Sequence, residues 1–216
     1  GVRLVGSEMC IRDRPQLGGF AQPWQEVEGN IHEDRALTLE VLQYLGVTDV
    51  LGSNHGARVY KSLSRRLPAF LKLPELQYQK FMGYDKAGIK YHPKGFEFAP
   101  GWITQHGDDF PLSSIPGLTA LNGAKRLGKS VVCGHTHRLG ISASTEAFNG
   151  RLGRTVWGVE VGNLVDLGSS GMAYTKGYAN WQMGFVICYV EQKKVVPVVV
   201  PVAVDGSFIF EGKLYK

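Results

Sequence analysis

Two histidines separated by one residue follow a short apolar run, in Val131-Val132-Cys133-Gly134-His135-Thr136-His137. Neutral imidazoles are common ligands of transition metals. On a regular strand His135 and His137 would point to the same face, because side chains alternate with period two. The pair could then share one metal ion or hold one ion each of a close pair. An ordinary solvated turn is the alternative, and the spacing alone does not separate the two interpretations.

Two other apolar runs end in the same way. The run 49–51 is followed by a glycine turn that carries Asn54 and His55, and the run 102–105 is followed by His106 and a glycine. Loops at strand ends are where α/β proteins usually build their sites. We therefore expect these strand ends to form one polar site.

The three blocks resemble the later part of the signature of the calcineurin-like metallophosphoesterases. That signature ends in Gly-Asn-His-Asp or Glu, then a lone His, then Gly-His-x-His. This chain has Gly52-Ser53-Asn54-His55, then His106-Gly107-Asp108, then Gly134-His135-Thr136-His137. The resemblance extends from about Ala36 to the last strands, and the Gly-His-Thr-His block is its most specific part.

The resemblance implies a role for each histidine of the blocks. Asn54, His106 and His135 would bind one metal ion, and His137 would bind the second. His55 would be catalytic, because the matching histidine of the family lies beside the leaving-group oxygen. There it acts as a general acid or stabilises charge on the phosphate.

The chain also departs from the family signature. Gly56 stands where an acidic residue is expected, and Ser53 is inserted before the Asn-His pair, while Arg58 could contact a phosphate oxygen instead. The first two blocks of the signature, which supply three carboxylates and a histidine, are absent. The resemblance therefore implies two divalent ions of manganese, iron or zinc in the intact protein, and one or none in this chain.

The first residues have an unusual composition. Residues 1–14 resemble translated sequencing-adapter read-through, so we interpret them as an artefactual leader outside the fold. The missing motif blocks would lie just upstream of the point where residues 1–14 meet the rest of the chain. One event would then explain both the unusual leader and the missing blocks. A genuine N-terminal extension or strand is the alternative. We expect residues 15–216 to form a single metallophosphoesterase-like domain, the C-terminal portion of the fold.

Composition narrows the class of protein. The chain has 216 residues, 44% of them hydrophobic, which is sufficient for one sizeable core. No apolar run approaches the roughly 20 residues that span a bilayer, so we expect a soluble protein with no membrane partner. The three cysteines, Cys10, Cys133 and Cys188, give no disulfide framework and favour a reducing, cytoplasmic compartment. No pattern indicates an oligomeric state.

The formal net charge is +5. Four basic residues follow the Asn-His turn on a predicted helix: Arg58, Lys61, Arg65 and Arg66. They could form a basic face that attracts a phosphorylated or nucleic-acid substrate. An ordinary solvated helix face explains them equally well.

Hydrophobic periodicity predicts the elements that position these residues. Helices are predicted over 33–45, 57–66 and 117–127, with a further helical region to about Met82. Strands are predicted at 47–51, 89–91, 96–98, 102–105, from 131, from 138 as strand then loop, and at 155–161, 183–191, 194–204 and 208–214. The later strands look antiparallel. This is an α/β fold, and the resemblance implies a four-layer α/β/β/α sandwich of two mixed sheets flanked by helices, incomplete at the N-terminus.

Acidic and amide side chains near the blocks have two interpretations. Asp108 and Asp109 could replace missing carboxylate ligands, although we expect one to orient His106 and the other to be solvated. Asn163 and Asp166 fall where relatives place a loop that closes over the site, and turn chemistry explains both equally well.

Our leading hypothesis is a metal-dependent phosphoesterase that hydrolyses a phosphomonoester or phosphodiester through a metal-activated hydroxide, with impaired activity in this chain. Its substrate would be a phosphorylated small molecule or a nucleic acid. The alternative is a catalytically silent protein that keeps the fold and binds a phosphorylated or nucleic-acid partner.

Overall fold

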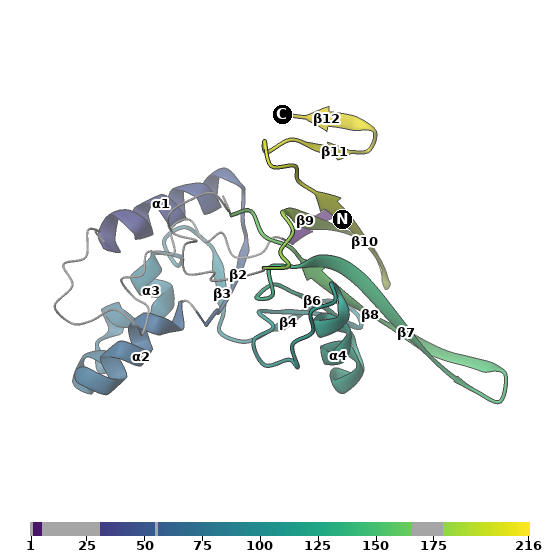
Figure 1. Cartoon of the computed structure of the whole chain (residues 1–216). Helices are drawn as coiled ribbons and strands as arrows, with labels where there is room; N and C mark the ends of the chain where they lie inside the picture. Colours follow the sequence, from purple (N-terminus) through teal and green to yellow (C-terminus); the bar gives the residue numbers. More distant parts are fainter. Residues whose placement is uncertain (1, 6–30, 55, 166–178) are drawn as a thin grey trace. The chain divides into compact units, whose positions relative to one another are not determined.

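The computed structural model describes residues 2–5, 31–54, 56–165 and 179–216 (Figure 1). The chain divides into two compact units. We call one the sheet unit (Gly1–Cys10, Gly95–Gly168 and Met172–Lys216) and the other the helical unit (Ile11–Lys94 and Ser169–Gly171). The single domain expected over residues 15–216 stays a prediction.

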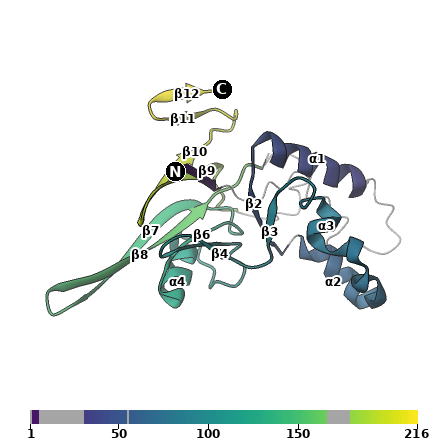
Figure 2. The same ribbon diagram turned by 180° about the vertical axis from the view of Figure 1, so that it is seen from behind.

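The helical unit contains helices and one short parallel strand pair (Figure 2). Its elements are α1 (Ile31–Tyr44), β2 (Asp49–Leu51), α2 (Ala57–Arg66), the 3-10 turns η2 (Pro68–Lys72) and η3 (Pro74–Leu76), α3 (Tyr78–Met82) and β3 (Lys90–His92). The helices predicted over 33–45 and 57–66 are confirmed. The predicted helical region beyond them is divided, because Pro68 and Pro74 each begin a new turn.

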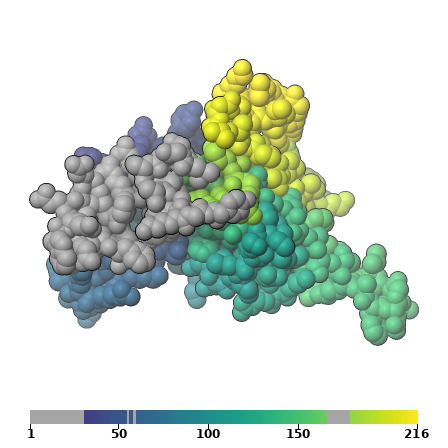
Figure 3. Space-filling view, viewed as in Figure 1, coloured from purple at the N-terminus to yellow at the C-terminus, as the bar shows by residue number. Residues whose placement is uncertain are grey.

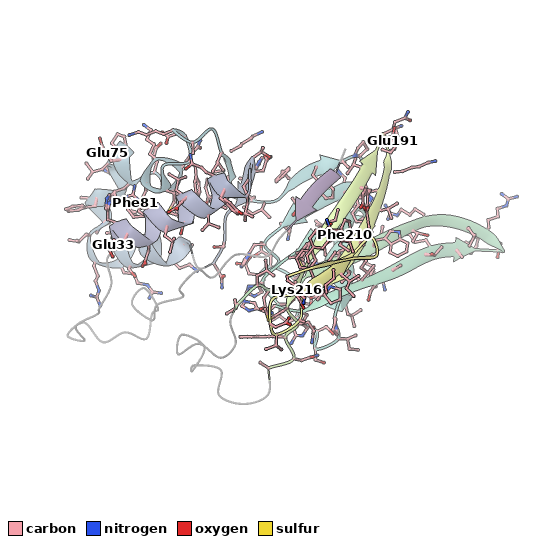
Figure 4. All side chains as sticks on the ribbon, turned by 90° about the horizontal axis from the view of Figure 1, so that it is seen from above. Glu33, Glu75, Phe81, Glu191, Phe210 and Lys216 are labelled. Atoms are coloured by element: carbon pink, nitrogen blue, oxygen red, sulfur yellow. The ribbon has the colours of Figure 1, made fainter. Side chains whose placement is uncertain are left out.

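Aromatic and polar contacts hold the helical unit together. The ring centroids of Tyr78 and Tyr91 lie 4.8 Å apart, and the guanidinium of Arg35 in α1 lies 4.5 Å from the ring centroid of Phe81 in α3. Phe81 is labelled in Figure 4. Across the strand pair, His92 Nε2 lies 2.7 Å from Asp49 Oδ1. Burial opposes ionisation of Asp49, yet the hydrogen bonds from His92 and Thr48 outweigh it, so the pKa of this carboxyl is lowered.

The sheet unit is built on a five-stranded mixed sheet with the order β4-β5-β6-β8-β7. Its strands are β4 (Phe96–Ala99), β5 (Trp102–Gln105), β6 (Ser130–Cys133), β7 (Leu139–Phe148) and β8 (Arg151–Val161). The three central strands β5, β6 and β8 run parallel, and the edge strands β4 and β7 are antiparallel to their neighbours. This central mixed sheet with its helices confirms the α/β fold class.

One face of the mixed sheet is covered by α4 (Leu118–Leu127). Val131, Cys133 and Val156 on this face pack against Ala120, Leu121 and Ala124 of the helix. Gly158 allows the helix to come close, because a Cβ at this position would lie only 2.0 Å from the backbone nitrogen of Leu121.

The opposite face packs against a second sheet. That sheet has the order β1-β9-β10 and consists of β1 (Val2–Val5), β9 (Gly184–Glu191) and β10 (Lys194–Pro201), all antiparallel. Val132 and Val159 of the mixed sheet form one buried cluster with Val186 and Cys188 of the second sheet. The sheet unit thus has three layers, in the order helix, mixed sheet and antiparallel sheet.

Three segments differ from the sequence prediction. The segment 138–149 is not strand followed by loop, because β7 continues to Phe148 and pairs with β8 as a long hairpin whose tip stands out from the sheet unit (Figure 3). The segment 208–214 is two strands, β11 (Phe208–Phe210) and β12 (Lys213–Tyr215), divided by Glu211 and Gly212 with positive φ. Val2–Val5 of the predicted leader form β1, while residues 6–14 lie outside the described residues.

Within the described ranges, no helix is both long enough and apolar enough to cross a membrane.

Candidate metal site

The candidate site lies where the parallel strands of the mixed sheet end. The register places Gln105 of β5 opposite Cys133 of β6, and Cys133 opposite Glu160 of β8. Carboxyl ends of parallel strands meet at one edge of a sheet, which is where α/β proteins place ligand sites. His106 and His135 therefore leave the sheet side by side.

The imidazoles of these two residues are in contact. His135 Nδ1 lies 3.1 Å from His106 Nε2, and their ring centroids are 4.8 Å apart in an edge-to-face arrangement. His106 is buried, with 8% of its surface exposed. Two nitrogens that each bind an ion at about 2.0–2.1 Å lie roughly 3 Å apart when they are neighbouring ligands. The pair therefore fits two adjacent coordination positions of one divalent ion, and a direct histidine–histidine hydrogen bond has the same spacing.

The surroundings of His135 favour its neutral imidazole, the form that binds metals. Burial lowers the pKa of this imidazole, and the negative charge of Asp108 opposes that effect. A lowered pKa keeps the ring neutral at physiological pH, the state in which histidine binds metals. Asp108 and Asp109 are both exposed. The charge of Asp108 acts on His135, and the orientation of His106 by one of these carboxylates stays a prediction.

His137 leaves the strand in a different conformation from the one that simple alternation requires. β6 ends at Cys133, and both His135 (φ 65°) and His137 (φ 59°) are left-handed. Period-two alternation does not extend through such residues, so it does not place the two rings on one face. The ring of His137 lies 4.5 Å from that of Trp181. Among the residues that the structure describes, no three His, Cys, Asp or Glu side chains gather in a group that could hold a metal.

The remaining predicted site residues belong to the helical unit. Asn54 lies in the turn after β2. The hydroxyl Oγ of the preceding Ser53 accepts a hydrogen bond from Gly56 N (2.9 Å), and the carbonyl oxygen of Ser53 accepts one from Ala57 N (3.0 Å). His55 lies outside the described residues, and only the backbone of Arg58, in the first turn of α2, is described.

A buried amide fixes His137 from the end of the third parallel strand. Asn163 is fully buried, and its Nδ2 donates to the carbonyl oxygens of His137 (3.1 Å) and Gln182 (3.0 Å). Its Oδ1 accepts a hydrogen bond from Val165 N at 3.1 Å. Asn163 thus joins three segments, which is more than local turn chemistry requires. Asp166 lies outside the described residues.

Sequence reasoning missed Glu160, the largest fully buried side chain of the described residues. Its Oε2 accepts a short hydrogen bond from Gly117 N, and the side chains of Thr119 and Thr136 also hydrogen-bond to the carboxylate. Burial raises the pKa of Glu160 despite these bonds and the positive charge of Arg138. The signal was present in the sequence, because Glu160 is the only charged residue in the apolar run 156–165.

Comparison with known proteins identifies phage relatives. No protein-family model matches the chain. The "Gene 54 protein" of Mycobacterium phage L5 is 33% identical over 198 residues, which cover 89% of this chain and 76% of that protein. The "Gene 54 protein" of Mycobacterium phage D29 is 33% identical over 177 residues, covering 80% and 68%.

The similar solved structures are more distant. A single mutant of Vps29 from Entamoeba histolytica aligns with a TM-score of 0.37 and 13% identity, covering 100% of this chain and 96% of that one. The double mutant of the same protein gives 0.39 and 12% with the same coverage. Vacuolar Protein Sorting 29 from Cryptosporidium parvum gives 0.31 and 19%, covering 59% and 55%.

Proposed function

The chain belongs to the family of the mycobacteriophage Gene 54 proteins, and for this member we propose the function of a metal-dependent phosphoesterase. One observation carries the proposal. His106 and His135, from the ends of two neighbouring parallel strands, bring two ring nitrogens to 3.1 Å. The second of them belongs to the Gly-His-Thr-His block, the most specific part of the metallophosphoesterase resemblance.

In this proposal His106 and His135 hold one divalent ion of manganese, iron or zinc, and His137 contributes to a second. A bound divalent ion would neutralise phosphate oxygens and lower the pKa of a coordinated water. The protein contributes neutral imidazoles, one of which is kept neutral by burial. The proposed reaction is the hydrolysis of a phosphomonoester or a phosphodiester.

For the helical unit we propose the roles that the sequence resemblance implies. Asn54 is a metal ligand through its amide oxygen, His55 protonates the leaving group, and Arg58 binds a phosphate oxygen. The substrate is a phosphorylated small molecule or a nucleic acid. The exposed Lys61 and Arg66 of α2 support an anionic substrate.

The proposed compartment is cytoplasmic. Cys133 and Cys188 are both buried free thiols. Burial raises the pKa of Cys188 to about 11, so this thiol is neutral and unreactive at physiological pH.

A second candidate function is a catalytically silent protein that binds a phosphorylated or nucleic-acid partner. Gly56 favours it, because the calcineurin-like metallophosphoesterases that the sequence resembles have an acidic residue at this position that orients the catalytic imidazole. This candidate predicts phosphate binding without turnover.

Hydrolysis of bis-para-nitrophenyl phosphate with Mn²⁺ separates the two candidates. We expect turnover by the full chain, and a loss of about 100-fold or more in kcat/KM for His137→Ala, because ligands supply transition-state charge stabilisation. His32→Ala, an exposed position in α1, is the matched control and should keep the parent rate. Equal turnover by the His137 and His32 variants would overturn the ligand assignment, and phosphate binding without any turnover would favour the silent protein.

A further inference from the structure

The turn that carries the candidate ligands has an unusual backbone. His135 and His137 both adopt positive φ, and Thr136 lies between them. Left-handed conformations are unfavourable for side chains with a Cβ, so such residues persist only where surrounding contacts hold them. Thr136 N donates to the carbonyl oxygen of Gly134 (2.7 Å), but this bond is local to the turn. Asn163 Nδ2 and Gln182 N both donate to the carbonyl oxygen of His137 and hold the end of the turn, so the anchor still to be identified is that of its centre.

Thr136 provides that anchor through its side chain. Unlike the two half-buried histidines beside it, this residue is buried, with 6% of its surface exposed. Its Oγ1 accepts a hydrogen bond from Arg138 N (3.3 Å), and its side chain hydrogen-bonds to the carboxylate of Glu160. The hydroxyl thus joins the centre of the turn to a neighbouring strand of the sheet.

Glu160 is fully buried on the face of β8 that α4 covers. Gly117 N, at the N-terminal cap of α4, donates to Glu160 Oε2, and Thr119 in the first turn of the same helix also hydrogen-bonds to this carboxylate. Gly117 also lies close to β7, since a Cβ there would be 2.9 Å from the backbone of Ile141. One buried acceptor therefore ties the start of α4 and the histidine turn to the sheet.

We propose that Glu160 is a positioning residue of the candidate metal site, which holds Thr136 and thereby keeps the flanking His135 and His137 in their left-handed conformations. The inference concerns the metal site and in that respect rests on the proposed function. The conformational part does not depend on a metal. Gly117 N donates to Oε2 of Glu160. Its other oxygen, Oε1, is buried without a hydrogen-bond partner among the described residues.

The chain offers a matched pair of substitutions. Thr136→Val removes the hydroxyl that joins the turn to Glu160, and Thr119→Val removes the hydroxyl that joins α4 to the same carboxylate. Valine has nearly the shape of threonine, and both sites are buried. Glu160→Leu is the direct test, because it removes both carboxylate oxygens at similar volume and leaves the hydrogen bond from Arg138 N to Thr136 Oγ1 in place.

Hydrogen exchange of two amides reports on the turn in the metal-free full chain. Gln182 N donates to the carbonyl oxygen of His137 (3.1 Å), and Gly162 N donates to that of Arg138 (2.7 Å). Neither amide is altered by the substitutions. We expect Thr136→Val to accelerate exchange at both by about tenfold, as loss of a buried hydrogen bond predicts. Glu160→Leu should accelerate exchange at both by a similar factor, and Thr119→Val should leave both exchange rates within about twofold of the parent.

Mn²⁺ titration of the same variants supplies the second readout. Thr136→Val should weaken binding by about tenfold relative to Thr119→Val, within the range that ligand-orienting residues contribute. Equal exchange rates in the two threonine variants, or a Glu160→Leu variant that exchanges as slowly as the parent, would overturn the proposal. If the parent binds no Mn²⁺ while the exchange rates differ, the proposed function fails and the positioning role stands.

Discussion

The imidazole of His135 lies against that of His106 because two parallel strands end in register. In our proposal Glu160, from a third strand, holds the backbone of the turn that contains His135. Residue types at these positions could be read from the sequence, since Gly-His-Thr-His after an apolar run is a specific signal. The left-handed φ of His135 and the burial of Glu160 could not be read from the sequence. Both depend on contacts between residues more than 20 positions apart in the chain, which no local pattern encodes.

At the scale of one residue, Glu160 makes stability depend on pH. Its pKa is raised by burial, with Arg138 and the three hydrogen bonds opposing the shift; Cys133, which also faces it, has a raised pKa and is neutral. A carboxyl group whose pKa is higher in the folded state than in the unfolded state stabilises the fold below the unfolded-state pKa of about 4.3. This stabilisation is lost as the pH rises through the folded-state pKa. Glu160→Gln has no titrating group at this position and should not show this loss. We therefore expect the free energy of unfolding of the variant to increase relative to that of the parent as the pH rises above about 4.3.

Urea denaturation of both proteins between pH 4 and 8 measures this difference. A difference in free energy of unfolding that is constant with pH would contradict the assignment of a raised pKa to Glu160.

At the scale of elements, α4 approaches the mixed sheet as closely as it does because β8 has a glycine beneath it. Local signals were sufficient for α4 itself, which ends at Gly128 in a left-handed conformation as expected. They were insufficient for β7 and for the β11–β12 hairpin. β7 extends through residues 144–148 because β8 pairs with them, and that pairing is a property of the partner strand rather than of the segment.

Gly158→Ala tests the helix–sheet contact. Its Cβ would lie 2.0 Å from Leu121 N, a backbone atom that cannot move without the helix. We expect a loss of about 1–3 kcal/mol in the free energy of unfolding, the usual cost of overpacking a core. Leu152→Ala is the control, because this side chain is 80% exposed on the same strand and should change stability by less than about 0.5 kcal/mol. Thermal or urea unfolding of the two variants checks the difference, and equal stability would contradict close packing at Gly158.

At the scale of the whole molecule, the predicted site residues belong to two compact units. His106, His135 and His137 lie in the sheet unit, and Asn54 and Arg58 lie in the helical unit. The sequence resemblance could predict the residue types in both units, because short motifs survive where overall identity is low. It could not supply the supporting residues Glu160 and Trp181, which no motif contains and which only the fold brings to the turn.

Equilibrium binding of Mn²⁺ to the full chain tests the central claim most directly, because the proposed activity depends on the histidine pair as metal ligands. Isothermal titration of metal-stripped protein should show saturable binding. The double variant His106→Ala, His135→Ala should lose about 100-fold or more in affinity, since two neutral imidazole ligands are removed. His32→Ala should bind as the parent does. An unchanged isotherm for the double variant, or no binding by the parent, would contradict the account.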